Sequence, residues 1–437
     1  MDLHYKDSAL IDENELSAEL ERLRPYRDHL AEVVENNDLT VPEASINLPG
    51  RIETLEEIEE MAAKVGTKSL RYVLVIGIGG SNLGAQAIYN AIYGKEYNFL
   101  EHQQTELLFL DTVSPTRLKN ILDLLRDEIK DPRELLVNVV SKSGSTNETI
   151  ANFKIVLQQL QELFPNIQDR FVFTTDKGTD LWNTAQKEGA HILEHPQHVG
   201  GRYSVLSVVG LFPLYLAGVD TKALLEGASS MVENSIDEDF SNSLSRLSAG
   251  IIYIHAKRGI RINNSFFFNP ELESVGKWYR QLMGESIGKQ YDVDGTEVNS
   301  GITPIVSIGS TDLHSMAQLY YGGPHDKLTN IVFARHPEGE FPIPDSDTYS
   351  GLVESLKGKS AGELMDAIIG GVKKAYENNG LPYVEVELPG INERSIGSYM
   401  QMKMVEMMYL AKLMNLNAFD QPSVEDYKLE TKKLLKL

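Results

Sequence analysis

The chain contains no cysteine among its 437 residues. It therefore has no disulfide framework, no thiolate metal site and no cysteine nucleophile, and this composition fits a reducing cytoplasm. Cations are also in short supply, because 41 Lys and Arg stand against 63 Asp and Glu, a formal net charge of −22. A field of that sign repels nucleic acids and anionic lipid surfaces, so we expect neither as a partner. An anionic substrate needs a local site that overrides this charge.

Long hydrophobic runs are missing too. The N-terminus is acidic from Asp2 onward and lacks the basic and apolar regions of a signal peptide. The longest apolar stretch, residues 205–219, is interrupted by Ser207, Gly210 and Pro213, and it is shorter than the ~20 residues that a membrane span requires. The sequence predicts a soluble, cytoplasmic protein in which this stretch forms a buried helix.

Short apolar runs alternate with helical patterns from residue 72 onward. The runs occupy 72–76, 106–110, 135–140, 171–175, 261–268, 303–309, 330–334 and 383–388. Unalternated runs rich in Val, Leu, Ile and Phe are typical of strands buried on both faces of a parallel sheet. Their alternation with helices implies right-handed crossovers. We therefore predict an α/β protein with two doubly wound parallel-sheet domains, each an α/β/α sandwich, and helical N- and C-terminal arms.

The length suggests two or three domains, at roughly 150 residues per domain. We predict an N-terminal helical arm at 1–65 that packs on the larger domain. A first, smaller domain at 66–220 carries a phosphate loop. A second, larger domain at 221–437 ends in the C-terminal helical arm.

The strand-to-helix turns are where open α/β sheets bind ligands. The first turn, VLVIGIGGSNLG (73–84), has glycines that let the backbone approach a ligand, and Ser81 or Asn82 is suited to cap the next helix. The dinucleotide fingerprint requires a third glycine where Asn82 stands, so NAD binding is disfavoured. A tight turn without a ligand remains an alternative.

The turn SKSGSTNET (141–149) places five hydroxyls around Gly144, directly after a predicted buried strand and before a helix. Hydroxyls, free amides and the positive end of a helix dipole suit a phosphate monoester. The alternative is a helix cap, but one Ser or Thr suffices for that role. We therefore favour a phosphate site.

A histidine cluster, HILEHPQH (191–198), suggests metal ligands at His191, Glu194, His195 and His198. Pro196 breaks any helix that would align them on one face, so we interpret them as loop or surface histidines and predict no metal site.

Two charged side chains are candidates for acid–base or oxyanion chemistry. Arg202, in GGRYSVLS, is placed to clamp a phosphate or stabilise an oxyanion, and pairing with a neighbouring carboxylate is an equal alternative. Glu285, in MGESIGK, lies beside apolar bulk that can raise a carboxyl pKa toward that of a general base, and a solvated glutamate at a helix end is the alternative.

Two further segments bear functional side chains. His314 opens a predicted helix after a buried strand and so faces a strand-end crevice. FDQPSVEDYK (419–428) carries Gln421 and Lys428 on a short C-terminal helix. Neither segment identifies a function alone.

Six segments together resemble the glucose-6-phosphate isomerase family in its shorter bacterial form. In the family's order they are IGIGGSNLG, SKSGSTNET, GGRYSVLS, GESIGK, the His314 segment and FDQPSVEDYK, and they span residues 76–428. The resemblance implies two sugar-isomerase (SIS) domains with helical arms, assembled as a homodimer with a shared active site, with a higher oligomer left open. It also implies reversible isomerisation of the phosphosugars glucose 6-phosphate and fructose 6-phosphate, in glycolysis and gluconeogenesis, without a cofactor.

The resemblance also implies roles for individual residues. Glu285 is the base that moves a proton between C1 and C2 through a cis-enediol, and Arg202 stabilises the enediolate. His314, contributed across the dimer interface, opens the sugar ring with Lys428. The matching substrate- and phosphate-binding positions are Gly80, Ser81, Ser141, Lys142, Ser143, Thr146, Gln281 and Gln421.

Two other functions use similar segments. A non-catalytic phosphosugar sensor needs the phosphate loop, but not Glu285, Arg202 and His314 together. An isomerase of a related phosphosugar, such as mannose 6-phosphate, stays open. An amido-transferring relative needs an N-terminal nucleophile domain, typically with cysteine, which this chain lacks.

Overall fold

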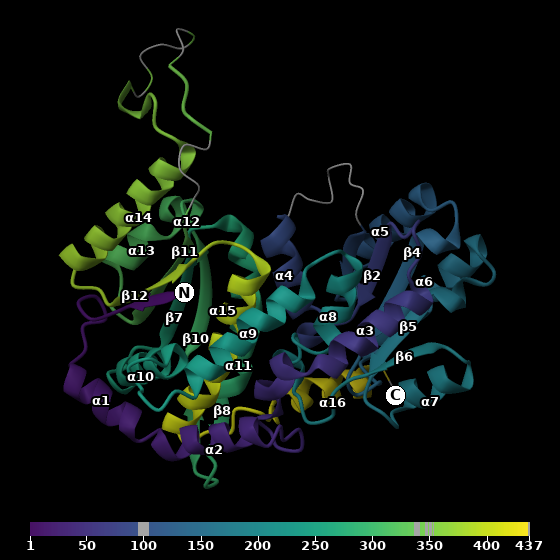
Figure 1. Ribbon diagram of the computed structural model, residues 1–437, viewed down its shortest axis with the longest axis horizontal. Coiled ribbons are helices and arrows are strands. Elements are labelled where there is room, and N and C mark those ends of the chain that lie inside the picture. The colour runs from purple at the N-terminus through teal and green to yellow at the C-terminus, as the bar shows by residue number, and fades with distance from the viewer. Residues whose placement is uncertain (95–104, 336–340, 346–347, 349–351, 353, 436–437) are drawn as a thin grey trace. The chain divides into compact units, whose positions relative to one another are not determined.

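The computed structural model in Figure 1 describes residues 1–94, 105–335, 341–345, 348, 352 and 354–435. Its residues fall into two compact units, each described by itself below. Unit 1 comprises residues 1–26, 237–395 and 405–437, and unit 2 comprises residues 27–236 and 396–404. The boundaries between these units differ from those that the sequence predicts, at residues 65 and 220.

Unit 2 contains a five-stranded, wholly parallel sheet in the order β3-β2-β4-β5-β6. The strands are β2 (Tyr72–Ile76), β3 (Glu106–Leu110), β4 (Leu135–Val140), β5 (Phe171–Thr175) and β6 (His191–Glu194). The first four confirm the predicted strands residue for residue. The fifth is absent from the prediction because His191–Glu194 is a short edge strand with few apolar residues.

Helices cover both faces of this sheet. They are α3 (Ile52–Val65), α4 (Leu83–Tyr93), α5 (Pro115–Glu128), α6 (Asn147–Leu163), α7 (Asp180–Lys187), α8 (Val208–Leu216) and α9 (Thr221–Ser235). Leu74 and Ile76 join a buried core with α5, α6 and α7. Val73 and Val75 are equally buried but face the opposite side, where α8 packs on β2, because side chains alternate along a strand. The apolar stretch predicted as a buried helix is α8.

Unit 1 contains a second five-stranded sheet in the order β1-β12-β11-β7-β10. β1 (Asp2–His4) is antiparallel to β12 (Tyr383–Leu388), and the other strands, β11 (Lys327–Ala334), β7 (Ile262–Phe267) and β10 (Thr303–Ile308), run parallel. This second sheet confirms the predicted α/β class. The sequence prediction lacks β1 because three residues carry no periodicity.

The helices of unit 1 and a small hairpin complete the fold. The helices are α1 (Glu13–Glu21), α10 (Leu244–Lys257), α11 (Glu273–Ile287), α12 (Thr311–Ser315), α13 (Ala317–Gly322), α14 (Ala361–Asn378) and α16 (Val424–Leu435). The hairpin pairs β8 (Lys289–Tyr291) with β9 (Glu297–Ser300). Residues 311–322 form two helices rather than the single predicted one, because the backbone leaves the helical conformation at Met316, with φ −120°. Two further helices, α2 (Arg24–Glu35) and α15 (Glu393–Leu413), contribute residues to both units.

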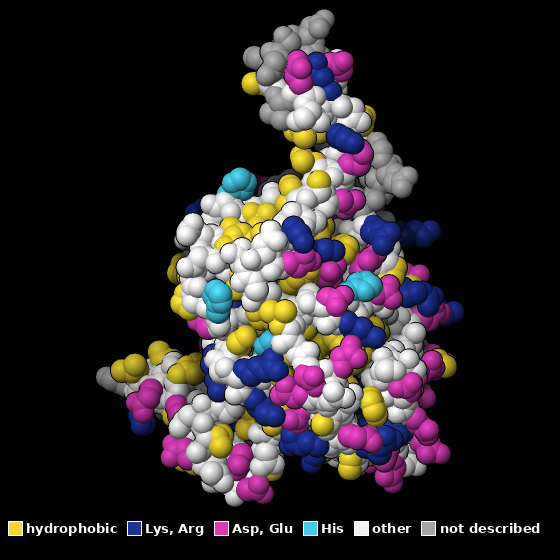
Figure 2. All heavy atoms as spheres, turned by 90° about the vertical axis from the view of Figure 1, so that its left-hand side faces the viewer, with side chains coloured by type: hydrophobic (Ala, Val, Ile, Leu, Met, Phe, Trp, Pro, Cys, Tyr) yellow, Lys and Arg dark blue, Asp and Glu magenta, His cyan; other side chains and the backbone are white. Residues whose placement is uncertain are grey.

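Charges of both signs are interspersed over the face of the molecule in Figure 2, where acidic side chains lie beside Lys and Arg. This view shows no extended basic surface, which agrees with the acidic composition. In the described part of the chain, no helix is both long enough and apolar enough to span a bilayer.

Helix α1 packs against α10 within unit 1. Asp12 caps α1 by accepting hydrogen bonds from the amides of Asn14 (2.9 Å) and Glu15 (3.0 Å). Gly250 on α10 makes the close approach possible, because a Cβ there would lie 2.9 Å from the side chains of both Leu16 and Leu20. The two helices thus meet across an apolar seam, and a larger residue than glycine at position 250 would require the Leu16 and Leu20 side chains to shift.

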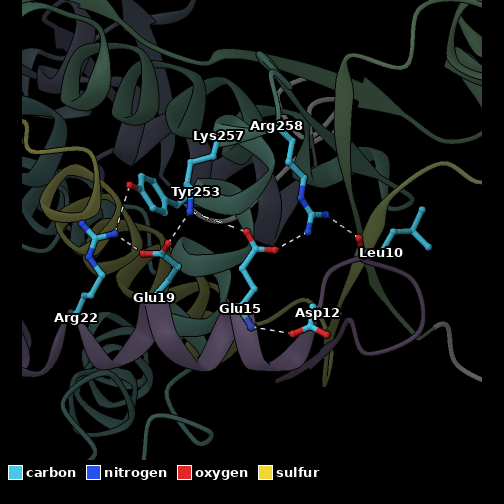
Figure 3. A network of polar contacts seen from close by, with 8 residues as sticks. All are labelled: Leu10, Asp12, Glu15, Glu19, Arg22, Tyr253, Lys257 and Arg258. Carbon is cyan, nitrogen blue, oxygen red and sulfur yellow. Dashed lines mark hydrogen bonds and ion pairs between the residues drawn. The ribbon is translucent and has the colours of Figure 1, made fainter.

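A charged network borders this seam (Figure 3). The Arg258 guanidinium donates to Glu15 at 2.6 Å, and the Lys257 ammonium donates to Glu19 at 2.8 Å. Arg22 also donates to Glu19. Burial alone would raise the pKa of Glu19, but the hydrogen bonds from Lys257 and Arg22 outweigh that effect and hold the pKa below its ordinary 4.5.

We predict that Glu19→Gln lowers the midpoint of thermal unfolding by about 2–4 °C at pH 7, because one charge-assisted network is lost at a cost of about 1 kcal/mol. A carboxyl with a depressed pKa stabilises the fold above its unfolded pKa. The difference between wild type and variant therefore shrinks as the pH falls below about 4.5. The control is Glu21→Gln. Glu21 lies on α1 like Glu19, but it is exposed and pairs with Arg24, so we expect this variant to leave the midpoint unchanged. Equal effects of the two variants would contradict the assignment.

Candidate functional site

The turns of unit 2 meet where its strand order reverses. β2 and β4 are neighbours, but the chain leaves β2 toward β3 on one side and continues from β4 toward β5 on the other. Such a reversal opens a crevice at the carboxyl ends of the strands, which is where open α/β sheets bind ligands. The first glycine-rich turn follows β2 and the SKSGST loop follows β4, so both lie at this point.

Glycine is required where the first turn meets the GGR segment. A Cβ on Gly80 would lie 2.1 Å from the carbonyl carbon of Gly201 and 2.6 Å from the amide nitrogen of Arg202, closer than any side chain allows. The contact is between backbones, so neither segment can shift locally to admit a side chain. It fixes the backbone of Arg202 beside Gly80 and Ser81.

The SKSGST loop presents hydroxyls at the start of α6. The hydroxyls of Ser141 and Thr146 are 3.0 Å apart, and the Ser143 hydroxyl accepts from the Ser145 amide at 3.3 Å. Thr146 precedes α6, yet its side chain makes no capping hydrogen bond to the helix. The hydroxyl is therefore not used as a cap, which favours the phosphate-site interpretation over the capping one.

Gly144 gives this loop its shape. Its φ of +65° is the left-handed region that suits glycine, and a Cβ there would lie 2.9 Å from side-chain atoms of both Thr179 and Leu181. The loop is thus pressed against the start of α7.

Lys142 links the loop to the segment before Arg202. Its ammonium donates to the Val199 carbonyl at 2.9 Å, and its own carbonyl accepts from the Asp176 amide at 3.1 Å. Burial lowers the pKa of the Lys142 ammonium, and the Asp176 carboxylate opposes that shift. The three turns are therefore tied together by backbone and side-chain contacts within unit 2.

The histidine cluster does not form a metal site in the structure. His191 and Glu194 lie on β6, and His195 is buried, with its Nδ1 3.1 Å from an Asp176 carboxylate oxygen. Among the described residues, no group of three or more His, Asp or Glu is arranged to hold a metal ion. His195 follows β6 in a loop, which is one of the two alternatives that the sequence interpretation gave, but it does not lie at the surface, because 1% of its surface is exposed.

Arg202 is buried within unit 2. It belongs to a short 3-10 helix, Gly201–Tyr203, and 2% of its surface is exposed. Its guanidinium carbon lies 5.4 Å from the centre of the Tyr203 ring, a cation–π distance. A guanidinium held in such surroundings interacts with a nearby anion more strongly than one in water.

In unit 1, Glu285 and Gln281 form a pair on α11. The Gln281 amide donates to a Glu285 carboxylate oxygen at 3.1 Å, one helical turn away. The other polar atom of Gln281, its carbonyl oxygen, is buried and has no hydrogen-bond partner among the described residues. Gly276 seats α11 on the sheet, because a Cβ there would lie 2.6 Å from Val306 and 2.7 Å from Phe267. The pair is therefore carried by a closely packed helix.

A cavity of about 550 Å³ lies beside this pair. Glu285 and Gln421 both line it, so the structure brings these two predicted residues to one space. The other lining residues are Gly284, Gly288, Lys289, Gln290, Tyr291, Asp292, Val293, Asn417, Asp420, Pro422, Ser423, Val424 and Asp426.

His314 and Lys428 lie elsewhere in unit 1. His314 is exposed on α12, directly after β10, in agreement with the predicted strand-to-helix position. Asp312 anchors this helix by accepting from the Ile308 amide at 2.8 Å. Lys428 lies on α16 and donates to Glu425 at 2.7 Å. Within the described part of unit 1, neither lines the cavity beside Glu285.

Two residues next to the unit 2 turns have buried polar atoms that the sequence does not reveal. Asn82 is buried, and neither polar atom of its side chain has a hydrogen-bond partner among the described residues. The Thr149 hydroxyl, in the first turn of α6, is likewise buried and unpartnered in that part of the chain. An unsatisfied buried polar group costs about 1–3 kcal/mol, so this arrangement is a signal that only the tertiary structure reveals.

Comparison with known proteins places these features in a family. The sequence model of the family described as phosphoglucose isomerase matches residues 31–336. A glucose-6-phosphate isomerase of Methanocaldococcus jannaschii is 34% identical over 372 residues, which cover 83% of this chain and 84% of the relative.

Two solved structures share the fold. A hypothetical protein of Thermus thermophilus matches with a TM-score of 0.84 and 31% identity, over 99% of both chains. A glucose-6-phosphate isomerase from Chlamydia trachomatis matches with a TM-score of 0.80 and 21% identity, over 99% of this chain and 88% of that one. The latter likeness is one of fold.

We predict that Gly80→Ala weakens binding of a sugar phosphate at least about tenfold, or 1.4 kcal/mol, because the new Cβ forces the Gly201–Arg202 backbone away. Titration calorimetry measures the effect. Gly200→Ala is the matched control, since its φ is −65° and the nearest atom to a new Cβ is 3.7 Å away. Unchanged affinity of Gly80→Ala would show that the approach of the two turns does not shape the site.

Proposed function

The chain belongs to the phosphoglucose isomerase family, and we propose how its residues divide the work of the family's reaction. The protein is an aldose–ketose isomerase that interconverts glucose 6-phosphate and fructose 6-phosphate, a step of glycolysis and gluconeogenesis. This assignment favours the enzyme over the non-catalytic sensor.

We propose that unit 2 holds the phosphate of the substrate. Ser81, Ser141, Ser143 and Thr146 supply hydroxyls, and Lys142 supplies a positive charge from within the same loop. The uncapped start of α6 supports this role, because free helix amides favour a dianion. A phosphate held there contributes binding energy remote from the reacting carbons, which positions them without taking part in the chemistry.

We propose that Glu285 transfers the proton. Its carboxylate takes the proton from C2 of the open-chain aldose, the C1 oxygen gains a proton to give a cis-enediol, and the same carboxylate returns a proton to C1 while the C2 hydroxyl loses one. Arg202 stabilises the negative charge that develops on oxygen during this exchange. The observation that carries the assignment is the hydrogen bond from Gln281, which orients the Glu285 carboxylate at the wall of the cavity that Gln421 also lines.

We propose that His314 and Lys428 open the sugar ring before isomerisation. An exposed histidine on a short helix can exchange protons with the ring oxygen near neutral pH. Because His314 does not line the cavity beside Glu285 in its own chain, we propose a homodimer in which a second copy contributes it.

The absence of cysteine supports a cytoplasmic location.

We predict that Glu285→Gln lowers kcat by about 10²–10⁴-fold and leaves the affinity for sugar phosphates unchanged, since glutamine keeps the shape but accepts no proton. The measurement is fructose 6-phosphate turnover in excess EDTA, coupled to an NADP-dependent glucose-6-phosphate dehydrogenase, with calorimetry for affinity. Glu271→Gln, an exposed glutamate ahead of α11, is the control. Near-normal kcat would remove Glu285 from the role of base.

We predict that inactive His314→Ala and inactive Glu285→Gln proteins regain activity when mixed under conditions of subunit exchange. Random pairing makes half of the dimers mixed, and each mixed dimer holds one intact shared site, so recovery approaches about a quarter of wild type. Exchange is verified independently with labelled subunits. Complete exchange without recovery would place His314 in the site of its own chain.

A further inference from the structure

Lys289 is a buried lysine that is held by groups of the protein. Its side chain is 4% exposed. The ammonium donates to the backbone carbonyl of Glu285 at 2.9 Å and to the backbone carbonyl of Asp420, and it lies 2.9 Å from an Asp420 carboxylate oxygen, an ion-pair distance. Two of its three N–H donors are therefore directed at the backbone of two different segments.

The contact to Glu285 caps the end of α11. The last helical hydrogen bond is donated by the Gly288 amide to the Gly284 carbonyl. The backbone is extended at Gly288, with ψ 96°. The Lys289 ammonium takes the next carbonyl, that of Glu285 itself. A cation at a helix C-terminus is stabilised by the helix dipole, so this arrangement also suits the charge.

The contact to Asp420 reaches a different part of unit 1. Asp420 immediately precedes Gln421, and both residues line the cavity of about 550 Å³ together with Glu285. One side chain thus ties the backbone of Glu285 to the residue before Gln421, across 131 positions of sequence. Without this tie, the segment around Gln421 would lose an ion pair and a hydrogen bond to the helix that carries Glu285.

We propose that Lys289, together with Asp420, is a positioning residue that fixes Glu285 relative to Gln421 for proton transfer. The inference rests on the proposed role of Glu285 as the base. A base must be held close to both C1 and C2, and a displacement of about 1 Å can cost on the order of 10² in rate. Lys289 provides this constraint through the backbone of Glu285 and of Asp420.

The two partners differ in what their removal leaves behind. The Asp420 side chain is 50% exposed, so its carboxylate can be solvated when Lys289 is replaced. Removal of the Asp420 charge leaves the ammonium its hydrogen bonds to the backbone carbonyls of Glu285 and Asp420, so Asp420→Asn is the milder change, whereas replacement of Lys289 removes the whole connection. Lys289→Met is therefore the first variant to test, because it keeps the length and apolar stem of the side chain.

The experiment compares Lys289→Met with Lys277→Met. Lys277 lies on α11, the helix that carries Glu285, and pairs with Glu273 at 2.8 Å, but its side chain is 46% exposed and it does not line the cavity. We expect Lys289→Met to lower kcat by about 10–100-fold with KM within about threefold of wild type, and Lys277→Met to match wild type in both. Thermal unfolding of each variant reports how much folded protein is present.

A second readout separates positioning from simple loss of structure. With substrate deuterated at C2, a carboxylate held near both carbons carries the label to C1, whereas a displaced carboxylate prolongs the enediol and loses more label to water. We expect the fraction of label transferred to fall at least about twofold in Lys289→Met and to stay at the wild-type value in Lys277→Met. A smaller amount of folded enzyme lowers the rate but leaves this fraction unchanged.

If Lys289→Met does not fold, Asp420→Asn replaces it as the test variant, since it removes the charge of Asp420 but keeps an oxygen acceptor. We expect Asp420→Asn to lower kcat by about 3–10-fold and to reduce label transfer. Wild-type label transfer in the folded variants overturns the proposal, even where kcat is lower. If wild type turns over neither sugar phosphate, the proposed function fails and this inference fails with it. Wild-type turnover with unaffected variants refutes the inference alone.

Discussion

The approach of Gly80 to Gly201 is the constraint on which the unit 2 site depends. A Cβ at position 80 would lie 2.1 Å from a backbone carbon, so the contact exists only because residue 80 has no side chain. Backbone cannot swing aside as a side chain can, and the contact therefore holds Arg202 in register with the turn after β2. The Lys142 bond to the Val199 carbonyl braces the same segment from the loop after β4. One surface is thus formed by three segments: the turn after β2, the loop after β4 and the segment that carries Arg202.

This surface solves an electrostatic difficulty. A chain with a net charge of −22 repels a sugar phosphate at long range, and screening limits that repulsion to roughly 8–10 Å at physiological salt. Near the site, local charges dominate. Arg202 is buried, burial lowers the pKa of Lys142, and Asp176 acts against that shift. In the phosphate site that we propose, the dianion would offset part of the cost of burying Lys142, because the interaction is stronger in surroundings of low dielectric constant than in water.

Sequence reasoning succeeded where burial imposes a simple pattern. The strands β2, β4 and β5 are buried on both faces, so unalternated apolar runs identify them to the residue. β6 lies at a sheet edge, where polar residues are tolerated, and its sequence HILE is interpreted as part of a loop or surface segment instead. The hairpin β8–β9 is largely exposed and has no apolar periodicity to detect.

The predicted site residues also differ in how directly a sequence pattern points to them. Ser141 and Thr146 are predicted from the sequence because ligands bind at the carboxyl ends of parallel strands, and the resemblance adds Lys142. Glu285 does not obey that rule, since it lies at the far end of α11, after the chain has crossed back toward the start of β10. The apolar residues beside it make it a candidate base, but an ordinary glutamate at a helix end has the same pattern, and only the resemblance assigns it that role. The unpartnered atoms of Asn82 and Thr149 depend on contacts between distant segments, which no local pattern encodes.

Glu285 is constrained at its side chain and at its backbone by different groups. Gln281, one turn earlier on the helix, directs the carboxylate, and Lys289, four residues later, holds the carbonyl. A side-chain hydrogen bond alone would leave the helix end free to fray, because the last carbonyls of a helix lack amide partners. A cap alone would leave the carboxylate free to rotate. Both are needed if one carboxylate is to reach two adjacent carbons in turn, and the Lys289 ammonium supplies the cap through its bond to the Glu285 carbonyl.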